Sequence, residues 1–565
     1  MSERPEISEP QPGFFHEIRI TVLPADIDVN GHANNAVYLR WVQEAATAHW
    51  FAALPAEVTA TCLWYVTRQE VDYRKPAREG DVLRVRTWVA AMSAVTSERR
   101  CRIYREGDGA LLAEARTLWC AINPGTGRPQ RVDPRIPAAL LPPAPAPEAG
   151  DPAAGKGGGA ESPPPPPAVV PEEGRYAARG VSASKTEVHA VVDKLDPGLF
   201  PGAFCKITED FLTGSPRHCN LTHSDGSGTK SILAYLWWRE TGDASVFRGI
   251  AQDSVVMNVD DLLCAGVTGR VLLSSTINRN ARAIPGAVLG ELIAGTEAFL
   301  EFLRSHGLDI RSGGGETADV GDLTATLTVD STATAVLERD AVVDASRIRP
   351  GMDIVALASG GVCAYDPEEN SGIGSNGLTS ARHELLARHY AEKYPETYDH
   401  ATPPALAYCG PYRLSDPLPG SPLCVGRALL SPTRTYAPFV LSLIRELGPR
   451  RVAGLVHCSG GALTKSLRFG AGVHFVKDNL HPVPPVFAAI QKASGTGARE
   501  MHKVYNMGQR LEVYCAPADT PRVLALAGDL GIAARVSGHV ESSKFPDARN
   551  HITIKTGSGE ILQYA

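Results

Sequence analysis

The sequence predicts a multidomain α+β protein, and three observations lead to this expectation. The chain has 565 residues, more than one hydrophobic core usually organises. A segment rich in proline and glycine, 142–174, separates a shorter first part from a longer second part. The first part combines one helical pattern with several alternating strand patterns, whereas the second mixes helices, strands and glycine-rich strings. We therefore expect a first domain over 1–141, a linker over 142–174, and about 390 further residues, enough for two α+β lobes.

Composition and charge are those of an ordinary globular protein. Hydrophobic residues make up 43% and charged residues 21% of the chain, and the formal net charge is -6. This balance offers no basic footprint for nucleic acid or an anionic membrane. No apolar run approaches the roughly 18–20 residues that cross a bilayer, and the polar start MSERPEISEPQPG is not a signal peptide. The 11 cysteines include no C-x-x-C pair, so we expect free thiols and a cytoplasmic location.

Residues 14–141 show one long helical pattern followed by strand patterns. The run NNAVYLRWVQEAATAHWF, 34–51, places apolar residues at helical spacing. The segments LWYVTRQEVDY, DVLRVRTWVAA, SERRCRIYRE and LLAEARTLWCAI alternate like half-buried antiparallel strands. One long helix against a twisted antiparallel sheet is the arrangement that these patterns predict.

A polar string directly precedes this helix. It reads DIDVNGHANNAVY over 26–38 and brings carboxylates, amides and a histidine to a helix N-terminus. The free amides and positive dipole end of a helix suit a thioester oxyanion, and a nearby carboxylate can attack the carbonyl or activate water. The alternative interpretation of this string is a purely structural one, an asparagine-rich helix cap with a histidine in the core.

This pattern resembles the hotdog-fold thioesterases, over about 14–137. The resemblance implies a hotdog fold for the first domain and hydrolysis of an acyl-CoA or acyl-ACP thioester. It assigns Asp28 as nucleophile or base and Asn30 and His32 as orienting groups, with Glu44 as a weaker catalytic candidate. Domains of this kind usually form dimers or tetramers. The alternative is a hotdog dimerisation module without catalysis.

The linker, 142–174, holds prolines and glycines in about half of its positions, including five consecutive prolines at 163–167. Such a composition has too little apolar surface to offset the entropy of ordering it. We expect a tether that spans on the order of 30 Å as a coil.

The second part carries helices at 286–306 and 378–394 and several glycine-rich strings. The string HSDGSGTK, 223–230, offers backbone amides, a carboxylate and an ammonium group. A helix-like run, 253–261, ends in adjacent aspartates, and GGGETAD, 313–319, adds a glutamate. A nucleotide triphosphate site needs this mixture, because carboxylates hold Mg²⁺ and amides and lysine neutralise phosphate oxygens. No G-x-x-x-x-G-K-[ST] string is present, which excludes a P-loop.

From about residue 175 to the end, the chain resembles the aminoimidazole ribonucleotide (AIR) synthetase family, whose reaction is phosphoribosylformylglycinamidine cyclo-ligation. The strings HSDGSGTK, DSVVMNVDDLLCAG, GGETADVGD, LLSPTRTYAP, GLVHCSGGALTK and MHKVYNMG are similar to that family's motifs and follow in its order. The resemblance implies an ATP-binding lobe over 175–345, a second lobe over 346–565, and a homodimer or higher homo-oligomer. It also implies ATP, Mg²⁺ and formylglycinamidine ribonucleotide as ligands.

Site residues carry over by motif. Asp225, Asp261 and Glu316 would bind Mg²⁺ and position ATP, and His457 would be an acid/base or substrate-orienting group. The other residues that the resemblance places around nucleotide and substrate are Lys185, Gly226, Gly228, Thr229, Lys230, Asn376, Thr433 and Arg434. The sequence departs from the family at Gly374, where a loop histidine is usual, and at FPGAFCKITEDFLTG, which replaces a glycine-rich stretch.

A sister ATP-dependent enzyme of the same superfamily is the alternative for the second part. Selenophosphate synthetase typically needs a reactive cysteine near its N-terminal lysine, and the cysteine nearest to Lys185 is Cys205. Thiamine phosphate kinase is the other such enzyme. The maturation dehydratase needs a C-terminal cysteine, whereas this chain ends in GEILQYA.

Overall fold

The computed structural model describes residues 14–29, 31–93, 95–126, 130–141, 178–181, 191 and 194–565. The chain divides into two compact units, 1–162 and 163–565, and each is described by itself. The division falls inside the predicted linker, 142–174, which lies outside the described residues. Whether this segment acts as a tether stays a prediction.

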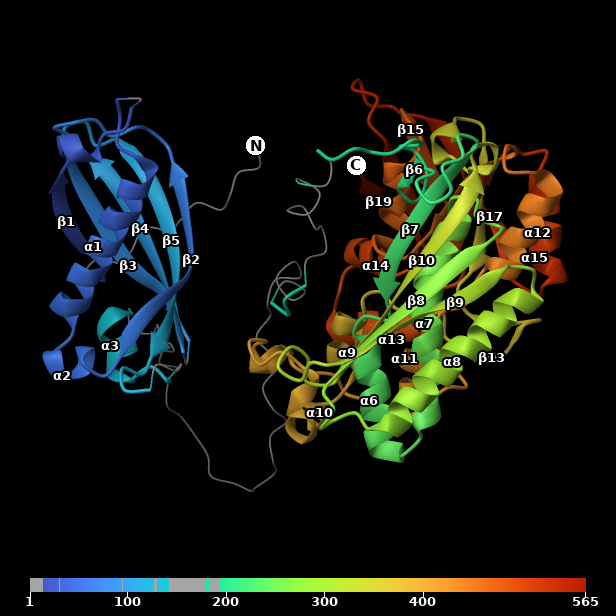
Figure 1. The fold of residues 1–565 in the computed structure, drawn as a ribbon, viewed down its shortest axis with the longest axis horizontal. Coiled ribbons are helices and arrows are strands. Elements are labelled where there is room, and N and C mark those ends of the chain that lie inside the picture. The colour runs from blue at the N-terminus through green and yellow to red at the C-terminus, as the bar shows by residue number, and fades with distance from the viewer. Residues whose placement is uncertain are drawn as a thin grey trace, which may run out of the picture. The chain divides into compact units, whose positions relative to one another are not determined.

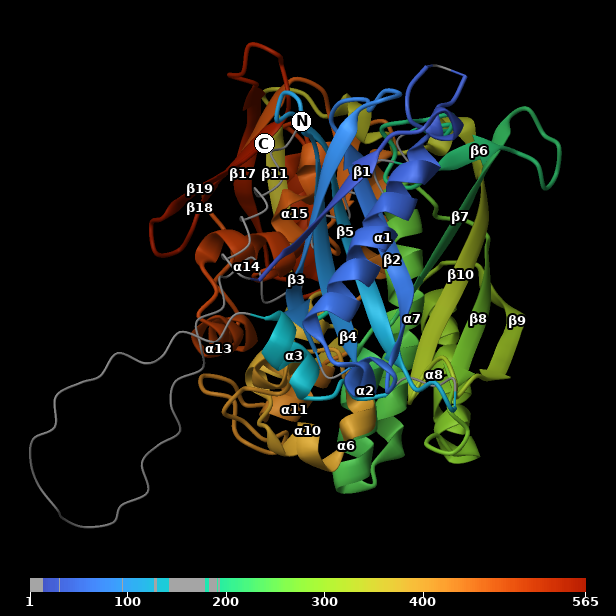
Figure 2. The ribbon, with the colours of Figure 1, turned by 90° about the vertical axis from the view of Figure 1, so that its left-hand side faces the viewer.

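The first unit is a five-stranded antiparallel sheet with one long helix on it, as the sequence predicted (Figure 1, Figure 2). The strands follow the order β1-β3-β4-β5-β2, so the last neighbour of the sheet is the first strand after the helix. The elements are β1 (His16–Thr21), α1 (Asn35–Ala53), α2 (Ala56–Thr59), β2 (Leu63–Tyr73), β3 (Val82–Met92), β4 (Thr96–Arg105), β5 (Leu111–Ile122) and α3 (Arg135–Leu140). This arrangement is the hotdog fold that the resemblance implied.

Helix α1 forms where it does because of its cap and its apolar stripe. The side chain of Asn34 accepts a hydrogen bond from the Ala36 amide at 2.9 Å, which satisfies one free N–H of the first turn. Tyr38, Trp41 and Val42, spaced by three and four residues, are buried against the sheet. The Tyr38 hydroxyl accepts a hydrogen bond from a loop amide at 2.9 Å. The helix is therefore fixed at both its start and its buried face.

The second unit begins with a five-stranded sheet whose one face is covered by helices. Its order is β6-β7-β10-β8-β9, antiparallel except for the parallel pair β8 and β9. Alternate residues of β10 are buried on the side of α7, so the other side keeps the hydroxyl-rich positions. The elements are β6 (Ile207–Glu209), β7 (His218–Gly226), α6 (Lys230–Thr241), α7 (Phe247–Cys264), β8 (Val271–Arg279), α8 (Gly286–Ser305), β9 (Ile310–Asp319) and β10 (Leu327–Glu338).

A second, seven-stranded sheet of order β14-β16-β11-β17-β15-β18-β19 follows. The predicted division at 345/346 falls between the two sheets, and we keep it as a prediction of lobe boundaries. The strands are β11 (Asp353–Ala358), β14 (Val452–His457), β15 (Val473–Lys477), β16 (Gln509–Cys515), β17 (Ala534–Ser542), β18 (His551–Lys555) and β19 (Ile561–Tyr564), with a hairpin of β12 (Gly361–Cys363) and β13 (Asp366–Asn370). The helices are α9 (Leu378–Leu385), α10 (His389–Lys393), α11 (Val425–Leu430), α12 (Ala437–Leu447), the 3-10 segment η7 (Ala462–Arg468), α13 (Pro485–Ser494), α14 (Ala498–Val504) and α15 (Thr520–Asp529).

The predicted helix over 286–306 is confirmed as α8, but the one over 378–394 is wrong as a single helix. It breaks between α9 and α10, where Leu386 has an extended backbone. Leu386 forms a bridge with Tyr412, and the Ala387 amide donates to the Tyr412 carbonyl at 2.8 Å. The chain thus satisfies these backbone groups with a distant segment instead of a next helical turn.

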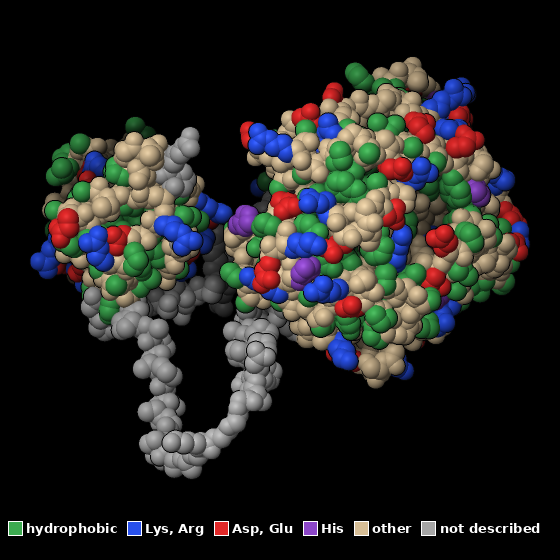
Figure 3. Space-filling view, turned by 90° about the horizontal axis from the view of Figure 1, so that it is seen from below, with side chains coloured by type: hydrophobic (Ala, Val, Ile, Leu, Met, Phe, Trp, Pro, Cys, Tyr) green, Lys and Arg blue, Asp and Glu red, His purple; other side chains and the backbone are tan. Residues whose placement is uncertain are grey.

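Surface and redox features agree with the composition. On the face of the second unit in Figure 3, basic and acidic side chains are interspersed, with no broad region of one sign. All 11 cysteines are free, as predicted. Among the described residues, we find no helix that is long and apolar enough to span a membrane.

Candidate functional site

Four segments that are far apart in the sequence meet in the second unit. The Thr229 and Thr379 hydroxyls lie 3.0 Å apart, which joins the HSDGSGTK string to the start of α9. The Ser375 hydroxyl lies 3.0 Å from that of Thr433, which joins the loop 372–377 to the segment 431–435. Helix α7 supplies the acids that lie between them, and β14 supplies His457. The site is therefore assembled from both lobes.

The pair of Asp261 and His457 lies at its centre. Asp261 Oδ1 is 2.6 Å from His457 Nδ1, and both side chains are buried. Burial, together with the positive charge of Arg510, lowers the pKa of His457 to about 4. A neutral imidazole at this distance from a carboxylate donates through Nδ1–H, which leaves Nε2 with its lone pair. That nitrogen is buried and has no hydrogen-bond partner among the described residues.

A second histidine, a lysine and a second acid surround Asp261. His223 Nε2 lies 3.5 Å from Asp261 Oδ2, and its Nδ1 lies 3.0 Å from the amide oxygen of Asn258. Burial alone would raise the pKa of Asp261, but Lys465, His457 and His223 lower it. For Asp225, desolvation and the charge of Asp261 raise the pKa, although the residue as a whole is exposed. We call Asp225, His223, Asp261, His457 and Lys465 the Asp261 cluster.

The Asp261 cluster contains two carboxylates, those of Asp225 and Asp261, that interact electrostatically. Mg²⁺ keeps several waters and is usually bound through one or two carboxylates plus substrate phosphates, rather than by an all-protein cage. The raised pKa of Asp225 beside Asp261 is typical of two acids that a cation would bring together. Among the described residues, no group of three or more acid, histidine or cysteine side chains is placed to hold a metal by itself.

The predicted convergence of three acids is therefore not found in the described chain, because Glu316 lies on the other face of the sheet. Asp225 is in register with Ser331 and Ser275, on the side of α7. Glu316 pairs with Thr276, which faces the opposite side. The cause is an irregularity at Leu273/Ser275, where β9 runs three residues, from Ser312 to Gly315, against two of β8.

Lys230 is placed deeper than a phosphate-binding lysine needs to be. It is fully buried and donates to Asp253 Oδ1 at 2.9 Å and to the Ser431 carbonyl at 2.6 Å. The same carboxylate oxygen accepts from the Thr433 amide at 2.7 Å and the Thr433 hydroxyl at 2.5 Å. Burial lowers the pKa of Lys230, and Asp253 opposes this effect. Lys230 and Thr433 thus tie α6, α7 and the segment 431–435 together, close to Gly226, Gly228 and Thr229.

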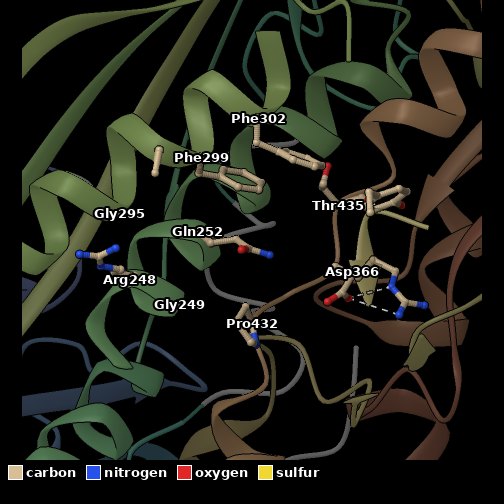
Figure 4. A pocket seen from close by; sticks show the side chains of 12 residues that line it. Arg248, Gly249, Gln252, Gly295, Phe299, Phe302, Asp366, Pro432 and Thr435 are labelled. Carbon is tan, nitrogen blue, oxygen red and sulfur yellow. Dashed lines mark hydrogen bonds and ion pairs between the residues drawn. The ribbon is translucent and has the colours of Figure 1, made fainter. Parts of the chain in front are cut away.

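Asn376 and Arg434, the two other residues predicted to line the substrate pocket, lie in different surroundings. Asn376 lies near Gly460 of the HCSGGA loop, and its Oδ1 is buried with no partner in the described segments. Arg434 instead faces the β12–β13 hairpin, where it donates to the Gly360 and Gly361 carbonyls and lies 3.3 Å from Asp366. It lines a pocket of about 380 Å³ between α7, α8 and this hairpin (Figure 4).

That pocket is separate from the Asp261 cluster, although it shares a wall with it. Gln252 of α7 lines the pocket, and nine residues later Asp261 projects from the opposite face of the helix. Pro432 and Thr435 line the pocket next to Thr433, which holds Asp253. Phe299 and Phe302, whose ring centroids are 5.5 Å apart, form its aromatic side.

In the first unit, the predicted residues lie in the loop before α1. His32 Nδ1 is 3.6 Å from Asp28 Oδ2, and the Asp28 amide donates to the His32 carbonyl at 2.9 Å. Glu44 is exposed on α1 and pairs with Arg40 at 3.4 Å instead. The Arg40 guanidinium also donates to the buried Asp26 at 2.7 Å, which holds this loop on the helix. The structure therefore brings Asp28 and His32 together, whereas Glu44 is linked to this loop through Arg40, which also contacts Asp26.

Two predicted residues, Asn30 and Lys185, lie outside the described residues. Three residues of the site were not singled out from the sequence: His223, Lys465 and Arg510. His223 begins the string HSDG, and Lys465 follows His457 by eight residues in GLVHCSGGALTK, so their place in the motifs was the available signal. Nothing in the sequence marks Arg510, whose role depends on packing.

Comparisons with known proteins agree with both units. Residues 22–149 match the family model of the thioesterase-like superfamily, and residues 211–337 match that of the N-terminal domain of AIR synthase related proteins. The chain joins a thioesterase-like domain to an AIR-synthase-related domain. The phosphoribosylformylglycinamidine cyclo-ligases of Methanocaldococcus jannaschii and Methanococcus maripaludis are 29% and 26% identical over 57% of this chain and 77% of their own. The probable thioesterase YbaW from Escherichia coli is 23% identical over 22% of this chain and 96% of its own, with a TM-score of 0.21.

Proposed function

We propose that the AIR-synthase-related domain cyclises formylglycinamidine ribonucleotide to aminoimidazole ribonucleotide at the expense of ATP. The observation that carries this proposal is the Asp261 cluster, where two acids meet a buried histidine with an open Nε2. The chemistry begins when the amide oxygen attacks the γ-phosphorus of ATP and ADP leaves. An internal nitrogen then attacks the activated carbon, the ring closes, that nitrogen loses a proton and phosphate leaves.

In this proposal the residues of the chain bind, orient and move protons. Asp225 and Asp261 would hold Mg²⁺, which when bound offsets the charge of the transferred phosphoryl group. Lys465 supplies a fixed positive charge to the same cluster. His457 is held by Asp261 through Nδ1, so that Nε2 is free to accept the proton of the ring-closing nitrogen. The burial of Asp261 and His457 keeps water from the activated intermediate.

The test is ADP release from Mg·ATP in the presence of formylglycinamidine ribonucleotide, with product identified by mass. Asp261→Asn should abolish turnover, because it removes a carboxylate of the cation pair and the partner of His457. Asp319→Asn on exposed β9 is the matched control and should keep wild-type turnover. Full turnover by Asp261→Asn would exclude the assignment.

The sister enzymes are less well supported. Cys205 is buried, its thiol donates to the Asp261 carbonyl at 3.3 Å, and burial raises its pKa well above the usual value. A protonated, inaccessible thiol is a poor nucleophile, which disfavours a selenophosphate synthetase type. Thiamine phosphate, supplied in place of the ribonucleotide in the ADP assay, tests the kinase type.

We also propose that the thioesterase-like domain hydrolyses an acyl-CoA or acyl-ACP thioester. Asp28 is the candidate base or nucleophile and His32 the orienting group, because they lie 3.6 Å apart in the loop that leads into α1. The competing view is a dimerisation module without catalysis. A panel of acyl-CoA thioesters, assayed with the full chain, separates the two.

A further inference from the structure

Arg510 is a buried arginine without a direct counterion. It is 1% exposed at the start of β16, and its one hydrogen bond within the described chain runs from Nη2 to the thioether of Met257 at 3.4 Å. Its Nε has no partner in the part of the chain that the structure describes. Asp253, Asp260 and Asp261 act on it through space, but none of these three acids forms an ion pair with it. Burying a guanidinium this way is costly unless a further group satisfies it.

A glycine makes room for this guanidinium. Gly374 has φ +70°, and a Cβ built on it would stand 2.1 Å from Nη1 and 2.9 Å from Cζ of Arg510. The head group of Arg510 therefore fills the space where a side chain of residue 374 would stand. The loop that carries Gly374 is fixed from the same strand region, since Asn506 donates to the Gly372 carbonyl at 2.8 Å.

Unsatisfied polar atoms also occur on the segments that meet in this site. Of the twelve buried side-chain polar atoms without a partner in the described chain, six belong to residues on the segments that meet here. They are Asp253 Oδ2, Ser359 Oγ, Asn376 Oδ1, His457 Nε2, Gln509 Oε1 and Arg510 Nε. Buried polar groups in native proteins are nearly always satisfied, so such a group of exceptions indicates a ligand that supplies the missing partners.

The chemistry of these atoms indicates what the ligand carries. Arg510 offers N–H donors in a planar fork, which matches the oxygens of a phosphate. Asn376 Oδ1 and Asp253 Oδ2 are acceptors and suit N–H or O–H groups of the same molecule. We propose that Arg510, seated over Gly374, is an anion-binding residue of this site and contacts a phosphate or phosphoryl group of the bound substrate. Only the identity of that substrate rests on the proposed function.

The direct test is the binding of inorganic phosphate and of Mg·ATP to the full chain by isothermal titration calorimetry. Arg510→Gln should weaken binding of at least one of them roughly 10-fold or more, the scale of a charge-assisted hydrogen bond, and Arg510→Lys should lose less. The matched control is Arg382→Gln, since Arg382 is also buried and also has an Nε without a partner in the described chain, but its Nη1 donates to the Thr397 carbonyl and the Tyr408 hydroxyl. It should bind as the wild type does.

A second pair of variants keeps the inference testable if Arg510→Gln does not fold. Gly374→Ala should displace the guanidinium and reproduce the loss of binding, because its Cβ overlaps Nη1. Gly351→Ala has a comparable φ of +86° and nothing within 4 Å of the added Cβ, so it carries the backbone strain alone. It should keep wild-type affinity. The double variant Gly374→Ala/Arg510→Gln should be no weaker than Arg510→Gln, because both changes remove one interaction.

The outcomes separate this inference from the proposed function. Phosphate binding that is lost in Arg510→Gln, in a wild type that does not turn over formylglycinamidine ribonucleotide, would sustain the anion site and reject the cyclisation. A wild type that cyclises, with Arg510→Gln and Gly374→Ala unchanged in affinity and KM, would overturn the anion site alone. A wild type that binds neither phosphate nor Mg·ATP would overturn it as well.

Discussion

In the first unit, the buried pair of Arg99 and His49 fixes the protonation state of the histidine. Arg99 is buried and donates from Nη1 to His49 Nδ1 at 2.9 Å. A guanidinium only donates, so His49 accepts through Nδ1 and must carry its proton on Nε2. Burial, with the charge of Arg99, lowers the pKa of His49 to about 4. The imidazole of the folded domain is therefore neutral in conditions where that of the unfolded chain starts to gain a proton.

This shift makes the first unit sensitive to acid. The folded pKa of about 4 lies below the unfolded value of 6.5, so the unfolded state binds the proton first and stability falls as pH drops from 6.5 toward 4. Between these two pKa values, the free energy of unfolding changes by about 1.4 kcal/mol per pH unit for one such group. His49→Gln keeps an acceptor for Arg99 and should flatten this dependence. Hydrogen exchange of peptides from α1 and β4 measures this pH dependence of stability. The rates are corrected for the intrinsic effect of pH, and a peptide from β10 in the second unit serves as the reference.

Asp28 is the second residue-scale prediction. Asp28→Asn removes the charge but keeps the backbone bonds with His32, so the loop before α1 should stay folded. Thioester hydrolysis should fall 10²-fold or more, as for loss of a general base or nucleophile. The exposed Glu44→Gln is the matched control, and it should retain activity. Equal rates for Asp28→Asn and the wild type would shift the assignment away from Asp28.

At the scale of elements, η7 is held in place by a buried ion pair. Lys477 of β15 donates to Glu512 at 2.6 Å, to the Leu463 carbonyl at 2.8 Å and to the Ser466 hydroxyl at 2.9 Å. Both charged side chains are fully buried. Leu463 and Ser466 lie on either side of Lys465 in the sequence. The ion pair of Lys477 and Glu512 therefore helps to position Lys465, which belongs to the Asp261 cluster.

Removing one partner of this pair should cost far more than removing both. Lys477→Met leaves the Glu512 carboxylate buried without its cation and should lower the free energy of unfolding by about 3–5 kcal/mol. Lys477→Met/Glu512→Gln should recover much of that loss, since no unpaired charge remains. Urea unfolding followed by circular dichroism measures both. Equal losses in the two variants would show that the charge itself is unimportant.

The elements also show which parts of the fold the sequence could predict. Helix α1 and the strands after it follow from local periodicity and from the cap Asn34, and they appear as expected. The nearness of Asp225 and Asp261 was expected from the resemblance, which assigns both acids to one site. The face of Glu316 could not be predicted, because one extra residue in β9 reverses the alternation and no local pattern records it. The contact of Gly374 with Arg510 joins residues 136 positions apart, which only packing reveals.

For the whole molecule, two compact units predict two separable activities. Residues 1–162 and 163–565 each have their own cores, so a change in one site should leave the other unaltered. We expect Asp261→Asn to lose cyclisation and keep thioester hydrolysis, and Asp28→Asn to do the reverse. Both activities measured on each purified variant give the answer. Loss of both in either variant would show that the units communicate.

A homodimer is the expected assembly, and the second unit presents a face for it. The side of the first sheet away from α7 carries Thr222, Ser224, Thr332 and Thr334, which hydrogen bond across the strands, and it also carries Glu316. Multi-angle light scattering should give twice the mass of the 60.2 kDa chain. Leu272→Arg places a large charge on this exposed face and should yield monomers, whereas Arg270→Leu beside it should not.

The overlap between a Cβ at 374 and the head group of Arg510 couples the two positions. The Cβ of any side chain at 374 would stand 2.1 Å from Nη1 of Arg510, so the two side chains cannot both hold these positions. We therefore expect a side chain at 374 to be tolerated only where Arg510 moves or is replaced, and the two positions to change together.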